Sequence, residues 1–116
     1  MEIIITGRSI EMTPALRDYA QEKAAKLEEF FKNIQKVEVI LEARHIENAD
    51  RAQVAEIRAW MGGLKMIQAQ EGGRDLYAAI DLVMAEAKRQ IEKHKEKTKH
   101  ETIRQAKKLK NQRHAI

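Results

Sequence analysis

The chain has 116 residues, no cysteine and a formal net charge of +4. This length fits one domain with a thin core, and the absence of cysteine excludes disulfides, thiolate zinc sites and a thiol nucleophile. Glu2 stands where a signal peptide carries positive charge, and no apolar run approaches about 18 residues, so we expect a soluble, cytoplasmic protein.

The first predicted elements are a strand and a helix. The segment Glu2–Gly7 is rich in isoleucine and ends in a glycine, which predicts a strand. Thr13 followed by Pro14 predicts a helix start, because the threonine oxygen accepts a free amide of the first turn and proline has no amide to leave unpaired. Apolar residues then recur at spacings of three and four, as on the buried face of an amphipathic helix: Leu16, Ala20, Ala24, Leu27, Phe31 and Ile34.

Three further strands are predicted. Lys36–Arg44 and Gln53–Met61 alternate between the two faces of a sheet, with the polar loop 45–50 between them. The pair Gly62-Gly63 predicts a hairpin turn, after which Leu64–Gln70 returns as the antiparallel partner.

A second amphipathic helix follows. The sequence Gly72-Gly73-Arg74 predicts a turn, and Asp75 caps the helix that begins after it. The apolar stripe fades after Ile91, while lysine and arginine continue to the end of the chain. We therefore expect residues 1–97 to form one α+β domain and residues 98–116 to form a basic tail, either a helical extension or disordered.

The order of the elements predicts an α+β fold of the type β-α-β-β-β-α. A right-handed crossover through the first helix makes the first two strands parallel, and both helices then cover one face of a four-stranded sheet. We expect Ile40 and Trp60 to be exposed on the opposite face, as a partner surface or as ordinary scattered apolar residues.

Motifs for catalysis and metal binding are missing from the sequence. The four histidines show no HExxH spacing, and no glycine-rich phosphate-binding loop is present. Asp75 and Asp81 lie about 240° apart around a helix, so they do not converge as a general acid and base. We expect neither an enzyme nor a cofactor or metal site.

The charge is distributed unevenly along the chain. Up to Ala85 there are 11 Lys and Arg against 14 Asp and Glu, a net charge of −3, whereas from Glu86 onward there are 11 against 4, a net charge of +7. A near-neutral body with a basic end is typical of a protein that binds nucleic-acid phosphates, although basic tails also serve solubility and membrane-surface contact.

Cations of the two helices are the candidate RNA-binding residues. In the second helix, intervals of four place Arg89, Lys93 and Lys97 along one exposed edge, and other lysines line a second edge. Lys23 and Lys26 share an exposed face of the first helix. Because aromatic residues are few, we expect recognition of RNA shape and phosphates rather than base stacking. The predicted RNA-binding residues are Lys23, Lys26, Lys88, Arg89, Lys93, Lys95 and Lys97.

Three stretches of the sequence resemble the ribosome hibernation promoting factors, also described as ribosome-associated inhibitors. The resemblance spans about residues 2–97. It is carried by Ile4–Gly7 with Glu11–Leu16, Tyr19, Lys23, Lys26 and Leu27; by Val37–Leu41; and by Asp75–Asp81 (DLYAAID) with Lys88-Arg89-Gln90-Ile91 and Lys93.

This resemblance implies a fold like that of double-stranded-RNA-binding domains, and binding to 16S rRNA at the decoding region of the small subunit in vacant ribosomes. Occupancy there blocks messenger and transfer RNA and inhibits translation in stationary phase or stress. The resemblance implies rRNA contacts for Lys23, Lys26, Arg89, Lys93 and Lys97, whereas Lys88 and Lys95 follow from charge alone. Glu86 departs from the family pattern, in which a lysine is common.

The chain looks like a short form of this family, and whether it promotes or opposes ribosome dimers stays open. We expect no small-molecule substrate, no membrane and no DNA as partners. The alternative function is a regulator with the same fold that binds another RNA, or a protein such as an alternative sigma factor, away from the ribosome.

Overall fold

The computed structural model describes the backbone of residues 1–63 and 65–114 and the side chains of residues 1–63 and 65–95. The predicted order β-α-β-β-β-α and the α+β class are confirmed. The elements are β1 (Glu2–Arg8), α1 (Pro14–Phe30), β2 (Ile34–Ala43), the short 3₁₀ helix η1 (Ala49–Arg51), β3 (Gln53–Met61), β4 (Lys65–Gly73) and α2 (Leu76–His114).

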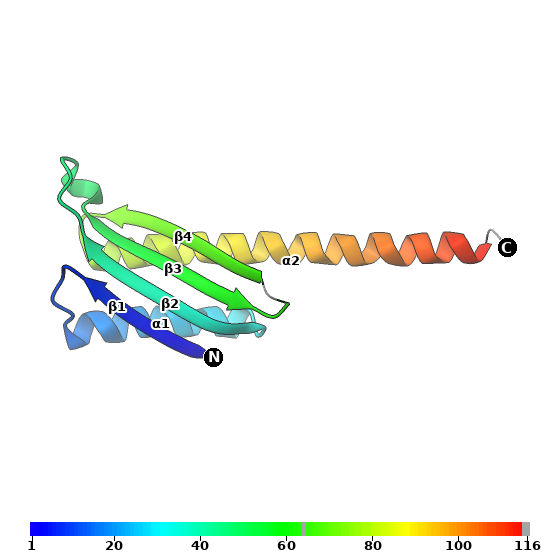
Figure 1. Ribbon diagram of the computed structural model, residues 1–116, viewed down its shortest axis with the longest axis horizontal. Coiled ribbons are helices and arrows are strands. Elements are labelled where there is room, and N and C mark those ends of the chain that lie inside the picture. The colour runs from blue at the N-terminus through cyan, green and yellow to red at the C-terminus, as the bar shows by residue number, and fades with distance from the viewer. Residues whose placement is uncertain (64, 115–116) are drawn as a thin grey trace.

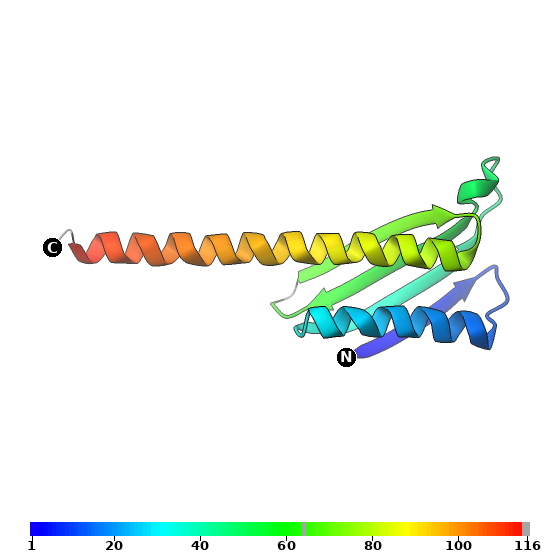
Figure 2. The ribbon, with the colours of Figure 1, turned by 180° about the vertical axis from the view of Figure 1, so that it is seen from behind.

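The four strands form one sheet in the order β1-β2-β3-β4. β1 pairs with β2 in parallel, as the crossover predicts, and the other two pairs are antiparallel. The two helices start at the same end of the molecule and lie side by side on one face of the sheet, and α2 runs on well past the sheet edge (Figures 1 and 2). Within the described residues, no helix has the length and apolar character needed to cross a membrane.

Both predicted helix caps are confirmed. The Leu16 amide donates to Thr13 Oγ1 at 3.2 Å, and Pro14 is the first residue of α1. The Ala78 amide donates to Oδ1 of Asp75 at 2.7 Å, and Asp75 is the residue directly before α2. Each cap satisfies an amide that the first turn would otherwise leave unpaired.

The hydrophobic core fills the space between the sheet and the two helices. The predicted helical stripes and the inward residues of the alternating strands meet there, and no polar side chain among those described is buried. Its largest fully buried members on this side of the sheet are Val37, Val39, Leu41, Ile57, Ile80, Val83 and Ile91.

The expected exposure of Ile40 is wrong. Its side chain does lie on the sheet face away from the helices, but it is only 2% exposed. Thr6 and Glu56 stand directly beside it on the neighbouring strands, and side chains in the middle of a four-stranded sheet cover one another in this way. Trp60 is half-buried, with the Lys36 ammonium 5.0 Å from its ring centroid. This open face therefore offers less apolar surface than the sequence predicted.

The predicted turn at Gly72-Gly73-Arg74 is wrong for its two glycines, because β4 continues to Gly73 and pairs with the start of β3, and the chain bends only at Arg74 and Asp75. Glycine is required here for space. A Cβ atom on Gly72 would lie 2.7 Å from the carbonyl oxygen of Arg51, and one on Gly73 would lie 2.9 Å from the Ala79 nitrogen. The other glycine pair does form the predicted hairpin turn, with Gly63 at φ +83°.

We predict that Gly72→Ala destabilises the fold by about 1–3 kcal/mol, because the new methyl group must push the η1 segment away from β4. Gly62→Ala is the matched control, since its Cβ would meet nothing closer than Asn33 O at 3.9 Å. Urea unfolding of both variants measures the difference. Equal stability of the two variants would contradict the close approach of η1 to β4.

Candidate nucleic-acid interface

The two helices face each other along a line of polar and aromatic side chains. Near the start of the helices, the Tyr19 hydroxyl donates a hydrogen bond to Asp81 Oδ1 at 2.5 Å, and the rings of Tyr19 and Tyr77 pack edge to face at 5.0 Å. Near the end of α1, the ammonium of Lys88 lies 4.4 Å from the ring centroid of Phe30. We call this line the α1–α2 seam: Tyr19, Lys23, Lys26 and Phe30 of α1, and Tyr77, Asp81, Lys88 and Lys95 of α2.

The helical period explains why these residues share one line. Tyr19, Lys23, Lys26 and Phe30 follow one another at spacings of three and four, so they form one flank of α1. Lys88 and Lys95 are seven residues apart, which is close to two turns, so both project from the same flank of α2. The seam thus brings together four of the seven predicted RNA-binding residues, from two helices that are far apart in sequence.

Aromatic rings hold three of the seam lysines in place. The ammonium of Lys23 lies 5.3 Å from the Tyr19 ring centroid, and that of Lys95 lies 5.9 Å from the Phe31 centroid. With Lys88 over Phe30, all three fall within the range of about 6 Å at which a ring face attracts a cation. A ring orients the ammonium without neutralising its charge, so the lysines remain able to bind a phosphate.

Among the described side chains, no carboxylate forms an ion pair with Lys23, Lys26, Lys88, Lys93 or Lys95. Arg58 on the open face of the sheet differs in this respect. It lies between two carboxylates, at 3.1 Å from Glu56 and 4.0 Å from Glu38. Arg58 is therefore compensated, whereas the seam lysines, like Lys36 over Trp60 on the open face, have no carboxylate partner among the described side chains.

At the end of the seam near the start of the helices, the side chain of Tyr19 is uncharged. The hydrogen bond to the Asp81 carboxylate raises the pKa of Tyr19 to about 12, with smaller contributions from desolvation and nearby carboxylates. A protonated tyrosine that donates to a carboxylate of the second helix ties the two helices together. Asp81 is the one carboxylate among the seam residues and lies at the Tyr19 end, so the other end, around Phe30, Lys88 and Lys95, carries positive charge alone.

Arg89 is held differently from the seam lysines. Its Nε and Nη2 atoms donate to the two carboxylate oxygens of Glu86 at 2.9 and 2.6 Å, and the Gln90 amide donates to the same carboxylate at 3.2 Å. These hydrogen bonds, that from Arg89 foremost, lower the pKa of Glu86 to about 2. Glu86 thus occupies the Nε–Nη2 edge of the guanidinium, which leaves the Nη1–Nη2 edge for a phosphate.

The seven predicted residues do not form one surface. Lys23, Lys26, Lys88 and Lys95 lie along the seam, whereas Arg89 and Lys93 are exposed on the side of α2 that faces away from the sheet. The side chain of Lys97 lies outside the described residues. The aromatic residues Tyr19, Phe30 and Tyr77 were not among those predicted from the sequence to belong to the RNA-binding surface. For Tyr19 and Phe30 the sequence contained one signal, the spacing of four in Tyr19–Lys23 and Lys26–Phe30.

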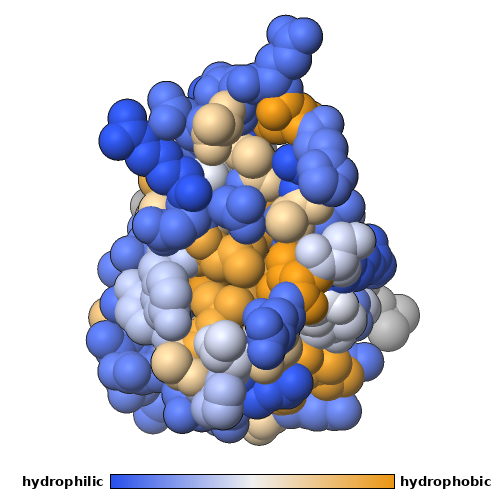
Figure 3. All heavy atoms as spheres, turned by 90° about the vertical axis from the view of Figure 1, so that its left-hand side faces the viewer, coloured by the Kyte–Doolittle hydropathy of each residue, from blue (hydrophilic) through white to orange (hydrophobic). Residues whose placement is uncertain are grey.

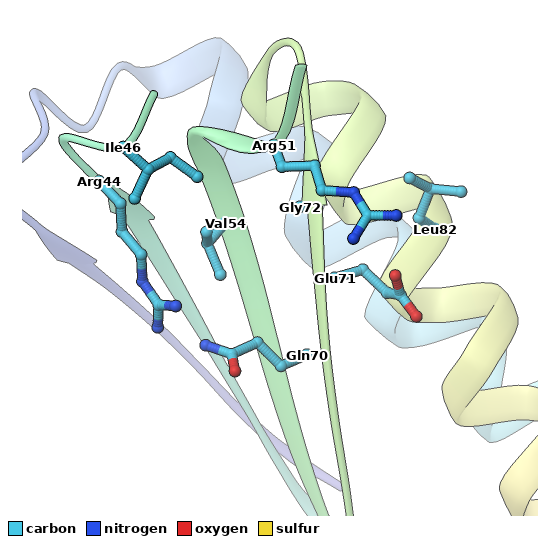
Figure 4. A pocket seen from close by; sticks show the side chains of 8 residues that line it. All are labelled: Arg44, Ile46, Arg51, Val54, Gln70, Glu71, Gly72 and Leu82. Carbon is cyan, nitrogen blue, oxygen red and sulfur yellow. The ribbon is translucent and has the colours of Figure 1, made fainter. Parts of the chain in front are cut away.

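A hollow elsewhere on the molecule contains none of the predicted residues. It has a volume of about 490 Å³ and lies where η1 meets the end of β4, with Arg44, Arg51 and Glu71 among its lining side chains. In Figure 4 the side chain of Arg51 reaches from the η1 segment toward Glu71 and Leu82. Figure 3, which faces this end of the molecule, shows apolar residues in its middle with hydrophilic residues around them. The described residues contain no group of three or more His, Cys, Asp or Glu side chains placed to hold a metal ion.

Comparison with known proteins identifies relatives over most of the chain. A family described as Sigma 54 modulation protein / S30EA ribosomal protein matches residues 3–99. Ribosome hibernation promoting factors of Klebsiella oxytoca and of Escherichia coli strain K12 are each 38% identical over 99 residues, which is 85% of this chain and 98% of theirs.

Two solved structures share the fold. A ribosomal subunit interface protein from Coxiella burnetii superposes with a TM-score of 0.70 at 25% identity, over 82% of this chain and 98% of that protein. The N-terminal domain of Protein Y from Thermus thermophilus superposes with a TM-score of 0.67 at 29% identity, over 81% of this chain and 99% of that domain.

We predict that Glu86 titrates with a pKa of about 2, compared with an ordinary value of 4.5, and that Arg89→Gln moves its pKa back up. Because the folded-state pKa is lowered, the pair stabilises the fold above pH 4.5, and this contribution is lost as the pH falls toward 2. NMR titration of the Glu86 side-chain carboxyl carbon measures both values. An Arg89→Gln variant with an unchanged Glu86 pKa would contradict the pairing.

Proposed function

The chain belongs to the Sigma 54 modulation protein / S30EA ribosomal protein family, and on this premise we propose that it is a ribosome hibernation factor that binds the small subunit through its helical face. Its relatives are named as ribosome hibernation promoting factors and, in one structure, as a ribosomal subunit interface protein. Membership in this family agrees with the expectation that the chain is not an enzyme. A protein of this kind acts in the cytoplasm, where ribosomes are.

The uncompensated positive charge of the α1–α2 seam supports this proposal most directly. A lysine without a carboxylate partner loses no ion pair when it binds a phosphate, and each bound cation releases condensed counterions from the RNA. Lys23, Lys26, Lys88 and Lys95 bind along the seam, and Arg89, Lys93 and Lys97 extend the contact along α2. Together these residues bind 16S rRNA.

Inhibition by such a protein is a matter of occupancy. We propose that it lies in the decoding region of vacant small subunits, so that messenger RNA and the anticodon stems of transfer RNA are excluded while it is bound. No group has to be activated for this purpose, and no cofactor is needed. Release depends on the number of phosphate contacts, which makes the bound state reversible and sensitive to salt.

The family description also supports a second candidate function. The description as a Sigma 54 modulation protein favours a regulator with the same fold that binds a sigma factor. A protein partner would engage fewer phosphate-like charges, so its binding would depend less steeply on salt than binding to ribosomal RNA.

We predict that a quadruple variant no longer co-sediments with vacant small subunits in a sucrose gradient. In this variant four seam lysines are changed to Gln: Lys23, Lys26, Lys88 and Lys95. The control variant carries the same loss of charge elsewhere, with Arg8, Lys36, Arg51 and Lys65 changed to Gln. It should sediment with the subunit as the wild type does. Equal loss of binding in both variants would show that only the total charge matters.

Salt dependence separates binding to ribosomal RNA from binding to a protein partner. With about five to seven phosphate contacts, the logarithm of the ribosome-binding constant should fall against the logarithm of salt concentration with a slope of roughly −4 to −6. Affinity measured between about 50 and 200 mM salt gives the slope. A slope near zero would contradict binding through rRNA phosphates and favour a protein partner.

A further inference from the structure

Phe30 is exposed in a way that the fold does not require. It is 56% exposed, the largest fraction among the large apolar side chains that the structure describes. The next residue, Phe31, supplies the core contact at this point and is only 6% exposed. An exposed ring contributes none of the stabilisation that burial would give. Because Phe31 and not Phe30 fills the core, the ring of Phe30 is available for contact with a partner.

One cation lies over this ring, and two further lysines belong to the same part of the seam. The Lys88 ammonium lies 4.4 Å from its centroid, and Lys95 lies over the adjacent Phe31. Lys26 precedes Phe30 by one helical turn on the same flank of α1. An apolar protein segment would have to bury these uncompensated charges, which opposes its docking here. A nucleotide matches both features of the site, because its aromatic base can stack on the ring and its phosphate can bind the lysines.

We propose that Phe30 stacks against an unpaired nucleobase of the bound RNA while Lys88 binds a phosphate beside it. This inference rests on the proposed function and adds to it a base contact, where the sequence indicated recognition of shape and phosphates only. The Lys88 ammonium lies over one face of the Phe30 ring, and the base stacks on the opposite face. Stacking is tolerant of sequence, because every base has a flat face, so the contact selects an unstacked nucleotide rather than a particular base.

Stacking and phosphate binding respond differently to salt, and this difference provides the test. Loss of a phosphate contact makes the salt slope shallower, whereas loss of a stacked base weakens binding at every salt concentration and leaves the slope unchanged. The variants are Phe30→Leu, which keeps apolar bulk but removes the flat ring, Phe30→Tyr, which keeps the ring, and Lys88→Gln, which removes the charge.

The experiment measures the affinity of the full chain for vacant small subunits across a salt series. We expect Phe30→Leu to weaken binding by about tenfold at each salt concentration with the wild-type slope. Phe30→Tyr should bind as the wild type does, and Lys88→Gln should reduce the slope by about 0.7–0.9. Thermal unfolding of Phe30→Leu should match the wild type, since the side chain lies outside the core.

Two results would overturn the stacking contact while the wild type still binds. Phe30→Leu could bind with wild-type affinity, or it could lose affinity together with a shallower slope, as expected if the ring only positions Lys88. Failure of the wild type itself to bind small subunits is a different result, and it would refute the proposed function and this inference together.

Discussion

The parallel pairing of β1 with β2 is the constraint on which the rest of the molecule depends. Two adjacent parallel strands require a crossover, and its right-handed form places α1 on the sheet face that α2 also covers. Because both helices begin at the same end and share one core, Tyr19 meets Asp81 and Phe30 meets Lys88. The seam that we assign to RNA is thus a consequence of the topology, since neither helix could present this set of side chains alone.

The surface of this fold carries two kinds of positively charged side chain: arginines that are paired with carboxylates and lysines that lie over aromatic rings. On the open sheet face and on the outer side of α2, arginines are bound to carboxylates, as in Arg58–Glu56 and Arg89–Glu86. Along the seam, lysines lie over aromatic rings, which orient the ammonium groups and leave their charge uncompensated. A phosphate must displace Glu86 to use the Nε–Nη2 edge of Arg89, whereas it displaces no carboxylate at Lys88. The seam lysines are therefore better placed than Arg89 to make the first contacts with RNA.

The sequence predicted most of the fold, because hydrophobic periodicity and helix caps are local signals. Thr13, Asp75 and the alternating strands all behaved as their local chemistry indicates. Its predictions were wrong at positions whose environment depends on contacts between segments that are distant in the chain. Gly72 serves the close approach of Arg51 rather than a turn, and Ile40 is covered by side chains of two other strands. For the same reason, angular position separated Lys88 from Arg89 but could not show that Lys88 faces Phe30, which depends on how the two helices pack.

In our proposal the helical face, and not the open sheet face, lies against ribosomal RNA. Lysine acetylation of the protein, alone and bound to vacant small subunits, tests it by mass spectrometry of each modified lysine. We expect binding to protect Lys23, Lys26, Lys88, Lys93 and Lys95, and to leave Lys36 and Lys65 as reactive as in the free protein. Protection of Lys36 and Lys65, with the helical lysines still reactive, would contradict the assignment and place the RNA on the opposite face.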